Sequence, residues 1–164
     1  MLHDGRWKVM VDRPESLVMR MIDQGDLIGQ CNASRLPEMP DGKQLSLEQF
    51  KSDVRQALGE SFGQLLDSTR LSTDDGRVVL RVVVNGTASG LAVNWVYYHV
   101  SDAAGRRASL VFTFEAGLAS RFAEADIKLI KALRLEDLSA QPAGKTDKNT
   151  EQADARSGAL PRRE

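Results

Sequence analysis

Apolar and polar residues alternate along the first part of the chain, which is the pattern of strands that bury one face. The alternation predicts strands over residues 7–11, 17–22 and 27–36. Turns are expected around Pro14 and Gly25, because proline fixes its own φ and glycine takes a positive φ at no steric cost. One face of the third strand carries small residues, namely Gly29, Cys31 and Ala33. A helix is therefore expected to pack close against that face.

The first helix is predicted from its ends as well as from its spacing. Ser46 and Gln49 have the separation of a capping box, and Leu45 and Phe50 have that of a hydrophobic staple. Apolar residues then recur at helical spacing, at Leu47, Phe50, Val54, Ala57 and Leu58. Gly59 is a typical residue for the end of a helix, so we expect the helix to lie between Ser46 and Gly59.

Three further strands follow in the second half of the chain. They are predicted over residues 78–84, 91–100 and 108–115. The last of them alternates most cleanly and would turn its apolar residues to a single side of a sheet. Residues 62–72 are predicted to form a linking strand or an irregular segment, with Leu65, Leu66 and Leu71 as its apolar anchors.

A second helix is predicted after these strands. Its apolar residues indicate a start at Ala119 or Glu124 and an end at Leu133. The resulting order, β-β-β-α-β-β-β-α, predicts an α+β fold in which an antiparallel sheet of about six strands packs with two helices. Residues 1–136 are expected to form a single domain. Residues 137–164 hold almost no large apolar side chain, so they are predicted to be a disordered C-terminal tail.

Composition limits the classes of partner. The 164 residues have a formal net charge of -1, so no basic field attracts nucleic acid or an anionic membrane. No apolar run approaches the ~20 residues needed to cross a bilayer, and membrane insertion is not expected. The N-terminal residues do not resemble a signal peptide. The chain as written is therefore expected to be cytoplasmic, or exported if it is a piece of a longer precursor.

Few side chains have the chemistry of a catalytic or metal site. Cys31 is the single cysteine, which excludes an intramolecular disulfide and a cysteine-based zinc site. His3 and His99 show no spacing typical of metal ligands, so no metal or cofactor is predicted. Free cysteines are usually buried, and we expect the same of Cys31. A Cys31-dependent enzyme would need an exposed thiol within hydrogen-bond reach of His99.

Two groups of residues are candidates for contact with a ligand or partner. Trp95, Tyr97 and His99 share one face of a predicted strand, and tryptophan and tyrosine are common at binding hot spots. Sheet packing is the favoured explanation of these aromatic residues. A polar strip on the strands of the first half is formed by Arg20, Gln30 and Asn32. This strip would bind a small polar ligand if it lined a concave surface, and it is otherwise a solvated sheet face.

Three passages resemble a known group of proteins. Residues 27–32 read LIGQCN, residues 47–50 and 57–59 read LEQF and ALG, and residues 95–98 read WVYY. Together they resemble a family of uncharacterised bacterial proteins, mainly from planctomycetes, whose members are often longer exported proteins. The element order also resembles the wider PsbP/Mog1-like fold. That resemblance implies a non-catalytic module that binds a partner, or a chaperone or exported accessory protein, and it carries over no functional residue.

The sequence thus leads to three hypotheses of different classes. The first is a non-catalytic protein-binding or accessory module that uses the face with Trp95, Tyr97 and His99. The second is a small-ligand-binding domain, with a pocket between sheet and helices lined by Gln30, Asn32 and Trp95. The third and least favoured is the Cys31-dependent enzyme. The sequence does not address the oligomeric state.

Overall fold

The computed structural model describes residues 5–39 and 43–135 of the chain. Within these residues, seven strands form one antiparallel sheet in the order β1-β2-β3-β7-β6-β5-β4. The strands are β1 (Trp7–Arg13), β2 (Ser16–Asp23), β3 (Asp26–Leu36), β4 (Phe62–Ser72), β5 (Val78–Ala88), β6 (Leu91–Ser101) and β7 (Arg107–Glu115). Three α-helices accompany them, α1 (Leu47–Leu58), α2 (Ala119–Phe122) and α3 (Ala125–Ala132), with short 3₁₀ turns η2 (Gly59–Ser61) and η3 (Ala116–Leu118). The α+β class with an antiparallel sheet is therefore confirmed.

The predicted number of about six strands was wrong, because residues 62–72 form a strand, β4, which brings the total to seven. This strand lies at one edge of the sheet and pairs only with β5. Its register shifts between Phe62 and Gln64 and again between Leu65 and Asp67. Each shift moves the following side chains out of step with the period of two, which is why the strand shows no clean alternation.

The second predicted helix is divided in two. Ala119 begins α2 and Glu124 directly precedes α3, so the two alternative starting points belong to different helices. Between them Ala123 has a φ of 48°, a left-handed conformation that interrupts the helical hydrogen bonds. By contrast α1 has the predicted bounds. The Ser46 side chain accepts a hydrogen bond from the Gln49 N–H at 3.1 Å, and Gly59 ends the helix with a φ of 53°.

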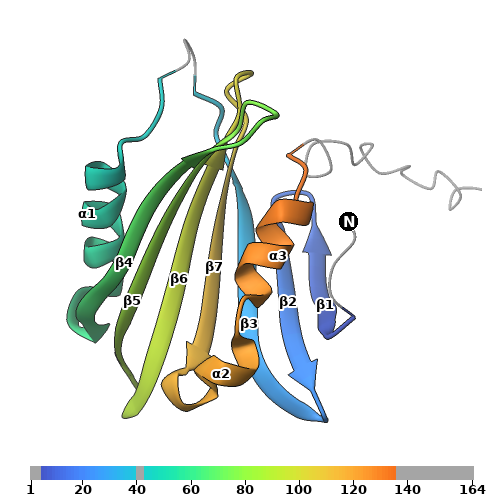
Figure 1. Ribbon diagram of the computed structural model, residues 1–164, viewed down its shortest axis with the longest axis vertical. Coiled ribbons are helices and arrows are strands. Elements are labelled where there is room, and N and C mark those ends of the chain that lie inside the picture. Colours follow the sequence, from blue (N-terminus) through green and yellow to red (C-terminus); the bar gives the residue numbers. More distant parts are fainter. Residues whose placement is uncertain (1–4, 40–42, 136–164) are drawn as a thin grey trace, which may run out of the picture.

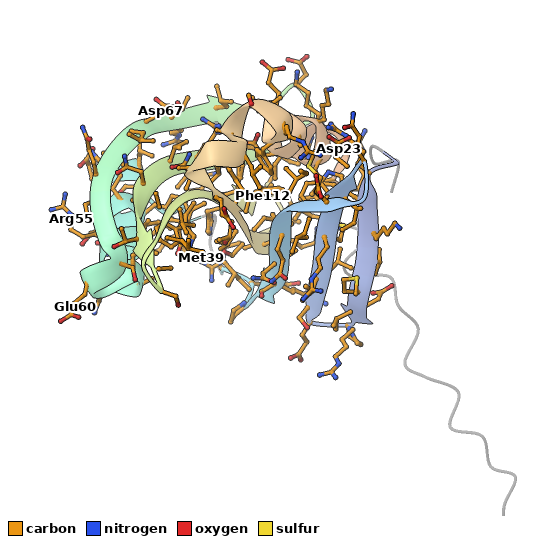
Figure 2. The ribbon with its side chains drawn as sticks, turned by 90° about the horizontal axis from the view of Figure 1, so that it is seen from below. Asp23, Met39, Arg55, Glu60, Asp67 and Phe112 are labelled. Carbon is orange, nitrogen blue, oxygen red and sulfur yellow. The ribbon has the colours of Figure 1, made fainter. Side chains whose placement is uncertain are left out.

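The helices lie on opposite faces of the sheet and over different strands. Figure 1 shows α1 beside β4 at one side of the sheet, and α3 in front of β3 and β2. Apolar side chains of α1 pack with Val78, Leu80, Val82 and Val84 of β5. A larger core joins α2 and α3 to the other face, where the sheet curves around them with Asp67 at one side and Asp23 at the other (Figure 2). Each face therefore has a part that is covered and a part that is not.

The small-residue face of β3 packs against a helix, as the sequence predicts. A Cβ added at Gly29 would lie 3.0 Å from the Thr113 carbonyl oxygen and 3.4 Å from the Phe122 ring of α2. Cys31 and Ala33 belong to the same core. None of the helices in the described part of the chain is long and apolar enough to span a bilayer. The predicted tail, residues 137–164, lies outside the described residues.

Candidate functional site

All five predicted contact residues lie on the face of the sheet that α1 partly covers. Gln30 pairs with Thr113, which in turn pairs with Trp95. One row along, Asn32 pairs with Val111, which pairs with Tyr97. Directly opposed residues of antiparallel strands point to the same side, so the pairing of β3, β7 and β6 brings the polar strip and the aromatic residues together.

The aromatic part of this group is mostly covered. Trp95 is 8% exposed and His99 is 3% exposed, whereas Tyr97 is half-buried. The Phe50 ring of α1 lies 6.0 Å from the His99 ring, and Tyr97 packs against the apolar cluster of α1. The aromatic residues therefore form no flat exposed patch, and Trp95 and His99 are packing residues in this structure.

The polar part of the group is open to solvent and is linked by hydrogen bonds. The Arg20 Nε donates to the Gln30 Oε1 at 3.3 Å, and the Gln30 Nε2 donates to the Asn32 Oδ1 at 3.1 Å. These two hydrogen bonds orient the side chains of the three residues on the adjacent strands β2 and β3. We use the name open face for the uncovered side chains around them: Lys8, Arg13, Val18, Arg20, Gln30, Asn32, Val111 and Thr113.

A shallow pocket of about 310 Å³ lies at one end of the open face. Gln30, Thr113 and Glu115 supply its polar groups. Its remaining lining is mostly apolar, from Leu27, Ile28, Gly29, Val93, Phe114 and Leu118. Of the three residues predicted to line a ligand pocket, Gln30 does so, while Asn32 and Trp95 are not part of the lining.

Cys31 lies on the other side of the sheet from His99. Its direct partner on β7 is Phe112, and both are buried in the core beneath α2 and α3. Burial raises the pKa of the Cys31 thiol, which disfavours the reactive thiolate. His99 instead faces α1. The hypothesis of a Cys31 nucleophile with His99 as its base was therefore wrong in its geometry.

The sequence analysis missed a cluster of charged and polar residues between the sheet and α3. Tyr98 donates its hydroxyl to Asp126 Oδ2 at 2.7 Å, and Arg81 donates to the same oxygen at 3.1 Å through Nη2. Arg81 also pairs with Asp67 on β4 at 3.1 Å. Asp126 is 1% exposed and lies in the first turn of α3, where the helix dipole favours a negative charge.

The contacts of this cluster indicate a structural role. Burial, followed by the Asp126 carboxylate, raises the pKa of Tyr98, so its hydroxyl stays protonated and keeps donating. The cluster thereby fixes α3 to β5 and β6. One sequence signal could have indicated it, because Arg81 is the single charged residue in the apolar run of β5. Among residues 5–39 and 43–135, no group of three or more His, Cys, Asp or Glu side chains could hold a metal ion.

No model of a protein family and no curated protein matches the chain. The resemblance to the planctomycete family and to the PsbP/Mog1-like fold therefore stays a prediction.

His99 should make stability depend on pH. Burial, and then the charge of Arg107, lowers the pKa of His99 below its ordinary 6.5, and neither ring nitrogen has a hydrogen-bond partner among the described residues. The unfolded chain therefore binds a proton at a higher pH than the folded one does. The free energy of unfolding should fall as the pH drops below 6.5, by at most about 1.4 kcal/mol per pH unit, and level off below the lowered pKa.

Urea unfolding between pH 8 and pH 5 measures this dependence. A His99→Leu variant should lose this contribution to the slope without a large loss of stability at pH 8, because it removes two unpaired buried nitrogens. Parallel pH profiles for the two proteins would contradict the assignment to His99.

Proposed function

We propose that this chain is a non-catalytic protein-binding or accessory module, and that the open face is its contact surface. The observation that carries the proposal is the hydrogen-bonded chain from Arg20 through Gln30 to Asn32, exposed on a sheet face beside the part that α1 covers. Side chains that are already oriented lose less conformational entropy when a partner binds. Half-buried Val18 and Val111 lie in the row of Asn32 and add apolar area to the same surface.

The proposal differs from the one drawn from the sequence in which residues touch the partner. Trp95 and His99 are buried and support the surface from within, and the Phe50 ring of α1 lies against His99. Tyr97 is half-buried at the boundary between α1 and the open face. The direct contacts would come from Arg20, Gln30 and Asn32.

Photo-crosslinking from the open face tests the proposal. A photoreactive phenylalanine analogue at Asn32 is expected to give an adduct of one defined protein mass in an extract of the native host, and excess unlabelled wild-type protein should suppress it. The matched control carries the same analogue at Lys128, an exposed position on α3 on the other face. Equal adducts at both positions, or none at Asn32, would count against the open face as the contact surface.

A small-ligand-binding domain is the second candidate, and the pocket of about 310 Å³ beside Gln30 favours it. Ligand pockets usually range from ~300 to 1,000 Å³, so this one is at the lower limit. Its apolar lining with a few polar groups suits a ligand of mixed character. For this candidate, native mass spectrometry of the purified protein would show a bound small molecule, and Asn32 would give no protein adduct.

A further inference from the structure

The open face contains a pair of like charges that the fold itself does not need. In the antiparallel pairing of β1 with β2, Lys8 lies directly opposite Arg20, and both side chains are exposed. Like charges at directly opposed positions destabilise a sheet. Arg13 lies on the same side, opposite Ser16. A local arrangement that opposes stability often marks a functional site.

Lys8, Arg13 and Arg20 have no acidic partner, whereas six other cations in residues 5–39 and 43–135 form ion pairs. Ion pairs join Arg35 to Glu38, Lys51 to Glu48, Arg77 to Asp75, Arg81 to Asp126, Arg106 to Asp102, and Arg121 to Asp23. Lys8, Arg13 and Arg20 form no ion pair with any residue in 5–39 or 43–135, and Arg20 reaches only the Gln30 amide, at 3.3 Å.

Acidic residues near these cations are directed elsewhere. Asp12 of β1 is paired with Leu17, which packs against the core on the opposite face. Asp23 and Asp26, at the ends of β2 and β3, both bind Arg121 of α2, at 3.2 Å and 2.9 Å. The described side chains of β1, β2 and β3 on the open face are therefore positively charged, polar or apolar, with none that is acidic. On β7, Glu115 points to the same side of the sheet and lines the pocket beside Gln30.

We propose that the open face binds an acidic polypeptide segment, a proposal that rests on the function proposed above. One carboxylate of the segment lies between Lys8 and Arg20, where it relieves their repulsion, and a second meets Arg13. Lys8 and Arg13 are separated by roughly 16 Å of strand, at about 3.3 Å per residue, so one small anion cannot reach both. Gln30 fixes the Arg20 guanidinium, which leaves its other N–H groups free for a carboxylate.

The structure favours an acidic polypeptide over a nucleic acid. Single-stranded nucleic acids bind to exposed aromatic side chains on which their bases stack. On this face Trp95 and His99 are buried, at 8% and 3% exposure, and Tyr97 is half-buried. The surface thus provides cations and amides but no stacking platform.

Fluorescence anisotropy with a labelled oligoglutamate of about ten residues tests the proposal. Wild-type protein should bind it saturably at low salt, and binding should weaken as salt screens the charges. The double variant Lys8→Gln, Arg20→Gln should bind about five- to thirty-fold more weakly, as expected for the loss of two exposed ion pairs. The matched double variant Lys128→Gln, Lys131→Gln changes the net charge equally on α3 and should bind within about two-fold of wild type.

Four results would overturn the proposal. They are the absence of saturable binding, equal weakening in both double variants, tighter binding of an RNA oligonucleotide of equal length, and aggregation of the Lys8, Arg20 variant with unchanged affinity. The last would mean that the cations only protect the exposed edge of β1 from pairing with another chain. The Asn32 cross-link separates this inference from the proposed function: if it persists in the Lys8, Arg20 variant, the open face is the contact surface but its partner is not acidic.

Discussion

Replacing Asp126 with alanine is expected to lower the free energy of unfolding by about 3 kcal/mol, the lower end of the range for breaking a buried ion pair. The substitution removes the acceptor for the Tyr98 hydroxyl and for the Arg81 guanidinium, which lie 2.7 Å and 3.1 Å from Asp126 Oδ2. The lower end applies because Arg81 remains partly exposed and keeps its contact with Asp67. Urea unfolding followed by circular dichroism measures the loss.

Glu124→Ala is the matched control for this experiment. Glu124 precedes α3 and is exposed, and its side chain makes no capping hydrogen bond. Its replacement should change the free energy of unfolding by no more than about 0.5 kcal/mol, as is usual for surface positions. If Asp126→Ala and Glu124→Ala had the same small effect, the cluster would not be what holds α3 to the sheet.

Phe112→Ala is expected to cost more, about 3–5 kcal/mol, as is typical of a buried phenylalanine. Phe112 is 0% exposed, and its ring lies 5.8 Å from those of Trp7 and Tyr98 and 6.1 Å from that of Phe122. Figure 2 shows it between the sheet and the helices α2 and α3. Truncation would leave a cavity where residues of β1, β6 and α2 meet, and chemical denaturation monitored by tryptophan fluorescence would measure the effect.

Two further variants provide stability losses with which that of Phe112→Ala can be compared. Phe112→Leu keeps most of the apolar volume and should cost clearly less than Phe112→Ala. Val111→Ala changes the neighbouring residue, which points to the open face and is half-buried, and should cost about 1 kcal/mol or less. A loss for Phe112→Ala no larger than that for Val111→Ala would show that the aromatic contacts do not organise the core.

The elements that the sequence predicts well are those with local signals. Helix α1 has its capping residues within its own sequence, at Ser46, Gln49 and Gly59, and its bounds follow from them. For β4 the sequence left a linking strand and an irregular segment as alternatives, because its two irregularities arise in pairing with β5, which no local pattern records. The break between α2 and α3 is equally hidden, since alanine rarely adopts the positive φ found at Ala123.

In the candidate site too, the features that depend on local sequence were predictable and those that depend on tertiary contacts were not. The alternation of strand residues predicts that Trp95, Tyr97 and His99 share a face, and that Gln30 and Asn32 share one. That both groups share the same face depends on β7 lying between β3 and β6. The burial of Trp95 and His99 depends on tertiary packing, such as that of Phe50 of α1 against His99, and no residue near them in sequence indicates it.

Strand β5 supplies side chains to both hydrophobic clusters at once. Val78, Leu80, Val82 and Val84 pack toward α1, whereas Val79 and Val83 pack toward the core of α2 and α3. Consecutive residues of β5 pack into the two clusters. Unfolding of either cluster would therefore displace β5 and disrupt the other. Helices α1 and α3 therefore belong to one cooperative folding unit, although they lie on opposite faces of the sheet. Detachment of α1 would expose one face of β5, the strand to which Asp126 fixes α3.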